Sequence, residues 1–468
     1  MTLTSLIGKK VHFIGIGGSG MSGIARIMLA EGVLVTGSDV KGSAAIDSLA
    51  GLGAQVFIGQ DASHVVGAHL VVASGAISES NPELAAARDL GIHIIFRAQA
   101  LAMLMAGKES VAVAGTHGKT TTTSMLTVAL QVAGKDPSFA IGGMINSSGV
   151  NAHRGSGSIF VAEADESDGS FTVYHPLGAI ITNIELDHVD HFATLAQIDQ
   201  IFLDFVATIA PGGFLVACID DPGVARLLAS ITRSDITIYT YGEGEADFQI
   251  SRIALEPDTS FARVSKNGTL LPELQLVVPG KHNVLNATAA LAAGIALGVS
   301  AEDMLDGLKR FTGSRRRFEH KGKVNGIEVI DDYGHHPTEI EVVLKTARRY
   351  VGAGRVIVIF QPHRYSRTQA FATQFATALG LADHTYILEI YAASEAPIPG
   401  ISSLLISREM SPAQVSYEPS MVETVNRVVS SAKPGDLIIT LGAGDVSSLA
   451  PVIVDALAEA SNSDEESN

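Results

Sequence analysis

Tryptophan is absent from the 468-residue chain, and aromatic residues make up only 6% of it. Because single-stranded nucleic acid is bound largely by stacking on aromatic side chains, this class of ligand is not expected. Basic residues are also few: 32 Lys and Arg stand against 49 Asp and Glu, a formal net charge of -17. Nucleic acids and anionic membranes need a basic surface, so neither is predicted as a partner. A small anionic substrate is still compatible with this charge, because a few Arg or Lys side chains can form a local site.

Cysteine occurs once, at Cys218, and therefore cannot form an internal disulfide. It lies in the apolar stretch Gly213–Ile219, so we expect a small buried strand residue rather than a nucleophile. Long apolar runs are missing as well: none reaches the ~20 residues of a membrane-spanning helix. The N-terminal Met1–Lys10 lacks the pattern of a signal peptide. These absences predict a cytoplasmic protein without membrane insertion, either a monomer or a homodimer.

The chain is long enough for about three domains at roughly 150 residues each. Apolar strands alternate with helical stretches in three successive units, which predicts mainly parallel sheets covered by helices on both faces. We predict an α/β protein of three domains: a Rossmann-like domain at 1–107, a central mononucleotide-binding domain of the P-loop type at 108–313, and a Rossmann-like domain at 314–468. Within the central unit, Phe248–Leu276 alternates between polar and apolar residues and is expected to be antiparallel.

A glycine loop, Gly115–Thr121, follows the apolar strand Ser110–Ala114 and precedes a helix start. The backbone amides of such a loop can surround phosphate oxygens, and the N-terminus of the helix attracts anions. Lys119 can reach the β- and γ-phosphates, and the hydroxyl of Thr120 can bind Mg²⁺. The general Walker A pattern requires a glycine where Val113 stands, so the match is imperfect. We interpret the loop as a nucleotide-binding site, with a purely structural turn as the alternative.

Two polar runs follow later strands of the central unit. Glu163 comes directly after the strand Ile159–Ala162, and its carboxylate suits Mg²⁺. The alternative is a solvated acidic loop. A second run, Thr182–His191, is rich in Asp and His and could bind metal or transfer protons. Within it we predict His188 as a metal ligand and His191 as a surface residue.

The first unit carries its own glycine loop. Gly15–Gly20 fits G-x-G-x-x-G between a strand and a helix, and Asp39 follows 19 residues after Gly20. This pattern predicts that a pyrophosphate binds at the helix N-terminus. Taken alone, it favours a nicotinamide-dependent dehydrogenase, which would leave the central loop without a purpose.

The third unit has three polar motifs. Arg315–Glu319 could form a basic surface patch. His335 and His336 are adjacent, so they lack the i, i+4 spacing of a helical zinc pair. Gln361–Arg367 follows a strand and carries two arginines and a histidine, which suits a small carboxylate.

These motifs together resemble the Mur ligase family, whose members build the peptide stem of bacterial peptidoglycan. The resemblance rests on Gly115–Thr121, on Val11–Gly23 with Gly37–Asp39, and on the strings Asp331–Pro337 and Gln361–Arg367. It extends from Val11 to about Ala450 and implies ATP-dependent formation of an amide bond through an acyl phosphate. The substrates it implies are UDP-N-acetylmuramate and L-alanine, and the implied cofactors are ATP and Mg²⁺.

The resemblance also implies roles for individual residues. The implied ATP contacts are Gly115, Thr116, His117, Gly118, Lys119, Thr120, Thr121, Asn286 and Arg317. The implied UDP-sugar contacts are Gly15, Gly17, Gly18, Ser19, Gly20, Met21 and Asp39, to which we add Ser74 and Arg97 at strand ends. The implied amino-acid contacts are Tyr333, His363, Arg364 and Arg367. Catalysis is assigned to Lys119, Glu163 and His188, and Mg²⁺ binding to Thr120, Glu163 and His188. By composition alone, Asn286 would instead be a helix cap.

One position departs from the family. Several relatives carry a carbamylated lysine about fifteen residues after the equivalent of His188, where this chain has Leu203. The carbamate is therefore absent or replaced by another group. The rival predictions are a ligase that attaches a whole tripeptide to the same UDP sugar, and a non-catalytic regulator that binds ATP or a UDP sugar. The Gly15–Met21 and Gln361–Arg367 strings favour the alanine reaction, and the presence of Lys119 argues against a regulator.

Overall fold

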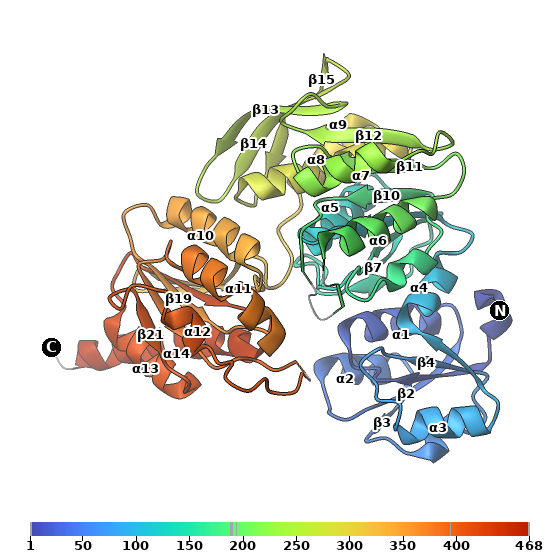
Figure 1. Ribbon diagram of the computed structural model, residues 1–468, viewed down its shortest axis with the longest axis horizontal. Coiled ribbons are helices and arrows are strands. Elements are labelled where there is room, and N and C mark those ends of the chain that lie inside the picture. The colour runs from blue at the N-terminus through green and yellow to red at the C-terminus, as the bar shows by residue number, and fades with distance from the viewer. Residues whose placement is uncertain (1, 188–190, 193, 394, 467–468) are drawn as a thin grey trace.

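The computed structural model describes residues 2–187, 191–192, 194–393 and 395–466. Figure 1 shows three α/β domains in chain order, with the N-terminal and the C-terminal domain each lying beside the central one. Within the described part of the chain, no helix is long and apolar enough to cross a membrane.

The N-terminal domain has a five-stranded parallel sheet in the order β3-β2-β1-β4-β5. The central strand β1 is almost fully buried, as expected for a parallel strand that is covered on both faces. Its strands are β1 (Lys10–Ile14), β2 (Leu34–Asp39), β3 (Gln55–Ile58), β4 (Leu70–Ala73) and β5 (His93–Phe96). Its helices are α1 (Ser19–Ala30), α2 (Ala44–Gly51), α3 (Pro82–Asp89) and α4 (Arg97–Met105).

The central domain has an 11-stranded sheet whose core is parallel. The core strands are β6 (Glu109–Ala114), β7 (Ser138–Ala140), β9 (Ile159–Glu163), β10 (Gly178–Ile181), β11 (Phe214–Cys218) and β12 (Thr237–Gly242), and the edge strand β8 (Ala152–His153) pairs with β7 in antiparallel orientation. The sheet continues into β13 (Phe248–Leu255), β14 (Ser260–Lys266), β15 (Thr269–Leu270) and β16 (Leu274–Leu276). The helices are α5 (Lys119–Val132), α6 (Leu195–Ala207), α7 (Pro222–Ser230), α8 (Lys281–Ala296) and α9 (Ala301–Lys309). The pairs β13–β14 and β14–β16 are antiparallel, as predicted for Phe248–Leu276, and Cys218 is buried as predicted.

The C-terminal domain has a six-stranded sheet in the order β17-β18-β22-β19-β20-β21, of which only the pair β17–β18 is antiparallel. Its strands are β17 (Glu319–Val324), β18 (Ile327–Asp332), β19 (Val356–Phe360), β20 (His384–Ile387), β21 (Val415–Tyr417) and β22 (Leu437–Leu441). Its helices are α10 (Pro337–Val351), α11 (Tyr365–Leu379), α12 (Leu404–Ser407), α13 (Met421–Ser431) and α14 (Leu449–Glu466). The predicted α/β fold of three domains with mainly parallel sheets is confirmed.

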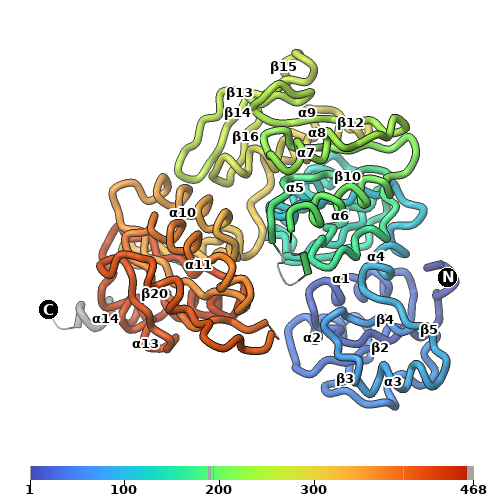
Figure 2. The backbone as a smooth tube through the Cα atoms, in the orientation of Figure 1, coloured from blue at the N-terminus to red at the C-terminus, as the bar shows by residue number. Residues whose placement is uncertain are grey.

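The two interdomain boundaries differ in chemistry. One apolar cluster runs from the N-terminal domain into the central domain, where it includes Ala152 and Phe171. The apolar clusters of the central and C-terminal domains contain no residue of the other domain, among the residues that the structure describes. A single extended segment links these two domains after α9 (Figure 2). Because interfaces without an apolar core are weak, movement of the C-terminal domain relative to the central domain is expected.

Candidate active site

The predicted phosphate loop joins β6 to α5 and is shaped by two glycines. Gly115 has φ of +132°, and a Cβ there would lie 2.0 Å from Oγ1 of Thr182. Gly118 has φ of +81° and forms the N-cap of α5, and its Cβ would lie 2.7 Å from Oδ1 of Asn286. Only glycine combines these backbone angles with such close approach. The second contact brings Asn286, a predicted ATP contact on α8, directly against the loop.

Lys119 at the start of α5 bends back over the loop. Its Nζ donates to the carbonyl of Gly115 at 2.6 Å, to that of Thr116 at 3.1 Å, and to Oε1 of Glu166 at 2.8 Å. Burial alone would lower the pKa of Lys119, but the nearby carboxylates of Glu166 and Asp165 raise it overall. The ammonium therefore stays charged at the place where a phosphate chain would lie.

The predicted magnesium ligands come together in part. Oγ1 of Thr120 donates to Oε1 of Glu163 at 3.0 Å, and the backbone amide of Gly142 donates to Oε2 of the same carboxylate at 2.7 Å. A hydroxyl and a carboxylate at one point suit Mg²⁺, which prefers oxygen ligands. The third predicted ligand, His188, lies outside the described residues.

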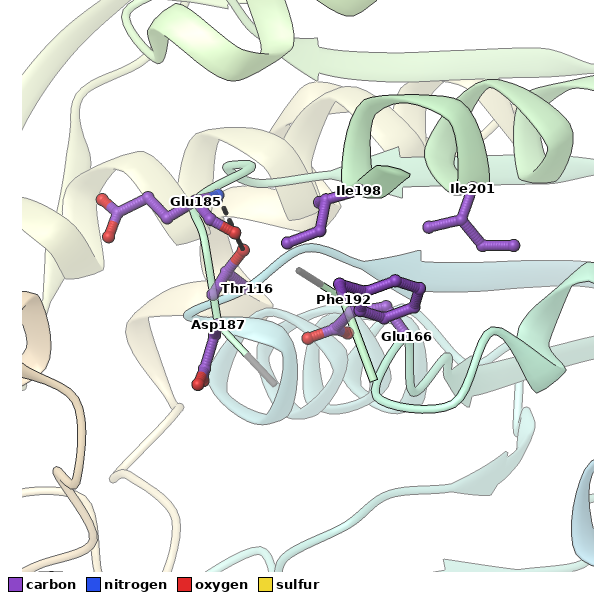
Figure 3. Close-up of a pocket in the computed structure, with 7 residues that line it drawn as sticks. All are labelled: Thr116, Glu166, Glu185, Asp187, Phe192, Ile198 and Ile201. Atoms are coloured by element: carbon purple, nitrogen blue, oxygen red, sulfur yellow. Dashed lines mark hydrogen bonds between the residues drawn. The ribbon is translucent and has the colours of Figure 1, made fainter. Parts of the chain in front are cut away.

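His117 of the loop reaches two carboxylates. Its Nε2 is 3.4 Å from Oε2 of Glu185 and its Nδ1 is 3.3 Å from Oε1 of Glu339 in the C-terminal domain. Burial would lower the pKa of His117, but these two carboxylates outweigh burial and raise the pKa to about 9. Glu185 also accepts a hydrogen bond of 2.7 Å from Oγ1 of Thr338. Figure 3 shows Glu185 beside the loop residue Thr116, whose hydroxyl accepts from the amide of Glu185 at 2.9 Å.

The predicted amino-acid residues form a cluster on the C-terminal domain. Arg367 is buried and donates to Oδ1 of Asp187 from Nε at 3.1 Å and from Nη2 at 2.8 Å. Its Nη1 is 3.2 Å from Nδ1 of His363. The rings of His335 and His363 have centroids 5.7 Å apart, and those of Tyr333 and His335 are 5.1 Å apart.

The histidines of this cluster are held neutral. Burial lowers the pKa of His335 to about 3, against the opposing effect of Glu339. Burial, followed by the charges of Arg367 and Arg364, lowers the pKa of His363 to about 4. Both rings therefore act as hydrogen-bonding groups rather than as cations near neutral pH. Arg364 has φ of +71° and forms the N-cap of α11, which places it at the same end of the helix as Arg367.

Arg317 links this cluster to the phosphate loop. Its guanidinium is 5.2 Å from the centroid of the Tyr333 ring, and its Nη1 is 3.6 Å from Oε1 of Glu339. The same carboxylate oxygen of Glu339 contacts His117. Arg317 thus lies beside the ATP loop although it belongs to the C-terminal domain.

The predicted UDP-sugar contacts Asp39, Ser74 and Arg97 lie close to the first glycine loop. The amide of Gly17 donates to Oδ2 of Asp39 at 2.9 Å, so this acid braces the loop. A Cβ on Gly15 would lie 3.4 Å from Cβ of Ser74, and a Cβ on Gly20 would lie 3.0 Å from Cδ of Arg97. The helix α1 begins at Ser19, so its first amides point to the same place, as they do in many anion sites.

This loop is connected to the central domain. Arg97 donates from Nη2 to Oδ2 of Asp165 at 2.9 Å, and Nδ2 of Asn151 donates to the carbonyl of Ser19 at 2.8 Å. Asp165 precedes Glu166, the partner of Lys119, in the acidic run. The predicted UDP-sugar loop and the predicted ATP loop therefore share one network of charges.

Sequence reasoning missed several residues of the site. They are the carboxylates and the hydroxyl that contact the predicted ligands: Asp165, Glu166, Glu185, Asp187, Thr338 and Glu339. Four of them lie in the acidic runs after β9 and β10 that drew attention to Glu163 and His188. Their position at the carboxyl ends of neighbouring parallel strands was an available signal.

Comparison with known families defines the class of protein. The family model described as Mur ligase family, catalytic domain, matches residues 10–109. The Mur ligase middle domain matches residues 113–294, and the Mur ligase, glutamate ligase domain matches residues 316–444. The chain belongs to the Mur ligase family, as its motifs predicted.

Similar proteins within the family carry a more specific name. The UDP-N-acetylmuramate–L-alanine ligase of Acidothermus cellulolyticus is 49% identical over 452 residues, which cover 96% of this chain and 95% of that protein. The ligase of the same name from Saccharopolyspora erythraea is 48% identical over 473 residues, covering 99% and 96%. Among solved structures, the UDP-N-acetylmuramate-alanine ligase of Thermotoga maritima is 30% identical, with a TM-score of 0.82 over 97% of this chain and 100% of that one. A murein peptide ligase of Psychrobacter arcticus is 28% identical, with a TM-score of 0.72 over 96% and 99%.

Proposed function

We propose that this protein joins L-alanine to the lactyl carboxylate of UDP-N-acetylmuramate with hydrolysis of ATP to ADP and phosphate, in the synthesis of peptidoglycan precursors. The observation that carries the proposal is that His117 of the phosphate loop contacts Glu339 of the C-terminal domain, whose carboxylate also contacts His335 and Arg317. Similar proteins that cover nearly the whole chain at 48–49% identity bear the name of this reaction. A cytoplasmic location and a monomeric or homodimeric state stay predictions.

The UDP sugar is assigned to the N-terminal domain. The amides of Gly18, Ser19 and Gly20 at the start of α1 would hold its diphosphate, since a helix N-terminus favours anions. Arg97 lies against this loop and would add positive charge. Its present partner, Asp165, is on the path toward the ATP loop, so the sugar carboxylate would extend in that direction.

ATP is assigned to the central domain. The loop Gly115–Thr121 and Lys119 would surround the phosphates, and Asn286 would contact the adenine from α8. Thr120, Glu163 and His188 would hold a magnesium ion, which would neutralise charge on the phosphate oxygens. The contact of Thr120 with Glu163 supports the first two of these assignments.

L-Alanine is assigned to the C-terminal domain. Arg364 and Arg367 would bind its carboxylate, beside the rings of Tyr333 and His363. With a pKa of about 4, His363 is too weak a base to take a proton from an ammonium group efficiently. It would therefore orient the amino acid rather than deprotonate it.

The reaction then follows from the chemistry of a carboxylate, which is a poor acyl donor because oxide is a poor leaving group. The sugar carboxylate attacks the γ-phosphorus of ATP, ADP leaves, and an acyl phosphate forms. The amine of L-alanine attacks the acyl carbon, loses a proton, and inorganic phosphate leaves. Lys119 would stabilise the charge that develops on the transferred phosphoryl group. Docking of the C-terminal domain would exclude water, which would otherwise hydrolyse the acyl phosphate.

Trapping of the intermediate tests this proposal. With ATP, Mg²⁺ and UDP-N-acetylmuramate but no amino acid, hydroxylamine should yield the hydroxamate of the UDP sugar. Adding L-alanine should instead give a product whose mass has increased by one alanyl residue. Formation of the alanyl product without any hydroxamate would contradict the acyl phosphate, and absence of both would contradict the proposed function.

A further inference from the structure

Two histidines and a glutamate meet between the phosphate loop and the C-terminal domain. One ligand atom from each of His117, Glu185 and His336 lies within 4.8 Å of the other two. Nε2 of His117 is 3.4 Å from Oε2 of Glu185, and Nδ1 of His336 is 3.8 Å from the same oxygen. The three side chains come from three segments, namely the phosphate loop, the loop that follows β10 and the N-cap of α10.

The surroundings of the cluster match those of metal-binding histidines. Such a histidine usually presents its second ring nitrogen to a carboxylate, which fixes the ring and its tautomer. Here Nδ1 of His117 contacts Oε1 of Glu339 at 3.3 Å. The carboxylate of Glu185 is in turn held by the hydroxyl of Thr338 at 2.7 Å. Both outer partners come from α10, so the helix that supplies His336 also supports the other two side chains.

The position of the His336 ring also favours metal binding. Its Nδ1 accepts a long hydrogen bond of 3.4 Å from the amide of Thr338, which places the lone pair on Nδ1. The residue is 5% exposed, and its Nε2 is buried without a hydrogen-bond partner in the described part of the chain. Because Nδ1 is the nitrogen that faces Glu185, an ion in the cluster would bind Nδ1 in place of the weak hydrogen bond from Thr338 and would leave the proton on Nε2. The ring edge of Phe371, 5.0 Å away between centroids, limits rotation of the imidazole.

We propose that His117, Glu185 and His336 bind one divalent transition-metal ion, such as Zn²⁺ or Co²⁺, that bridges the central and C-terminal domains. Two imidazoles and one carboxylate select such ions over Mg²⁺, which prefers oxygen ligands alone. Three protein ligands leave a fourth position open to water or a ligand, as in many zinc sites that are not purely structural. This site shares no ligand with the magnesium site assigned to Thr120, Glu163 and His188, and an ion bound to it would tie the ATP loop to α10.

Cobalt titration of the metal-stripped full chain tests the site. Co²⁺ is added without ATP and in the presence of excess Mg²⁺, and its visible ligand-field absorption is followed. One equivalent of Co²⁺ should bind, Zn²⁺ should displace it, and Mg²⁺ should not. Because the ion joins two domains, Zn²⁺ should also raise the midpoint of thermal unfolding.

Variants separate this site from other ligands on the surface. His336→Ala and Glu185→Gln should each weaken Co²⁺ binding by more than the roughly 10- to 100-fold that loss of an outer partner costs. Thr338→Val, which removes only an outer partner, should weaken it within that 10- to 100-fold range. His320→Ala is the matched control, because His320 forms a histidine–carboxylate pair with Glu328 at 2.5 Å and should leave binding unchanged.

The proposal is overturned if the wild-type chain binds no Co²⁺, if Mg²⁺ displaces it, or if Glu185→Gln binds it as tightly as the wild type. Should His336→Ala fail to fold, Glu185→Gln decides the question, since it preserves the shape of a half-buried side chain. None of these results depends on turnover, so failure of the metal site leaves the proposed ligase reaction untouched.

Discussion

The guanidinium of Arg367 donates two hydrogen bonds to Oδ1 of Asp187, across the boundary between the C-terminal and central domains. Both side chains are about 5% exposed. This pair is a buried polar contact between the C-terminal and central domains, whose boundary has no shared apolar cluster among the residues that the structure describes. Arg367 is also assigned to L-alanine, so substrate binding and domain docking involve the same guanidinium.

Removal of the Asp187 carboxylate should weaken the docking of the C-terminal domain on the central domain. Asp187→Ala leaves a buried guanidinium without its partner, a change that typically costs about 3–5 kcal/mol. We expect a lower midpoint of thermal unfolding and a higher KM for L-alanine. The control is Asp306→Ala, which breaks the exposed pair with Arg310 and should cost less than about 1 kcal/mol. Equal effects of the two substitutions would mean that Arg367 and Asp187 do not hold the interface.

Loss of the loop lysine should stop the chemistry but leave the first domain intact. In Lys119→Ala, the phosphate loop loses the ammonium that would oppose the developing charge on the phosphoryl group, and Glu166 loses its hydrogen bond of 2.8 Å to this lysine. We expect no detectable turnover, whereas UDP-N-acetylmuramate should still bind with unchanged affinity in calorimetry. Lys135→Ala, at an exposed lysine beyond the end of α5, is the control and should keep full turnover. Loss of sugar binding in Lys119→Ala would show that the two sites are not separable.

A methyl group added to the phosphate loop should weaken ATP binding far more than one added to an open turn. Gly115→Ala places a Cβ 2.0 Å from Oγ1 of Thr182 at φ of +132°, so the loop must shift. Gly134→Ala also has positive φ, at +73°, but its Cβ meets nothing within 4 Å. Gly134→Ala should therefore lower the free energy of unfolding by only about 1–2 kcal/mol, the cost of holding a residue with a Cβ in the left-handed conformation. ATP binding by calorimetry should be lost in Gly115→Ala and kept in Gly134→Ala; retention in both would contradict the packing described here.

The motifs of the site could be predicted, because glycine loops and acidic runs at strand ends are local patterns. The strand–loop–helix order around Gly115–Thr121 required only nearby residues. Asp39 was predicted only as a UDP-sugar contact, and its hydrogen bond from the amide of Gly17 was not predicted. The pairing of Arg367 with Asp187 could not be predicted, since the residues are 180 positions apart and meet only when two domains dock. For the same reason Arg367 was expected to face a substrate carboxylate, while the structure shows it already bonded to a carboxylate of the protein.

The contact between His117 and Glu339 could not be predicted from the sequence either. Glu339 lies on α10 of another domain, and nothing in the sequence near either residue indicates that they meet. A histidine in a phosphate loop was predicted only as an ATP contact. The structure adds that, in the metal-free chain, His117 is a charged link between domains with a pKa of about 9, so binding of the proposed metal ion would release one proton from it.

This link should make stability depend on pH. The pKa of His117 rises from an ordinary 6.5 to about 9 on folding, so its contribution is complete below pH 6.5 and is lost as pH rises through 9. His336 shows the opposite shift, to about 4, because burial disfavours its charged form, so its contribution is lost as pH falls below 6.5. Urea unfolding of the metal-stripped wild type should therefore show a loss of stability between pH 6.5 and 9 that is absent in metal-stripped His117→Gln. Parallel curves for the two proteins would contradict the charged link.

Phosphate release measured against each substrate in turn tests the proposed reaction most directly. With ATP and Mg²⁺, release should require both UDP-N-acetylmuramate and an amino acid, and L-alanine should exceed glycine, L-serine and the peptidoglycan tripeptide. Release that needs no UDP sugar, a rate with L-alanine no higher than with glycine or L-serine, or preference for the tripeptide would contradict the proposed function.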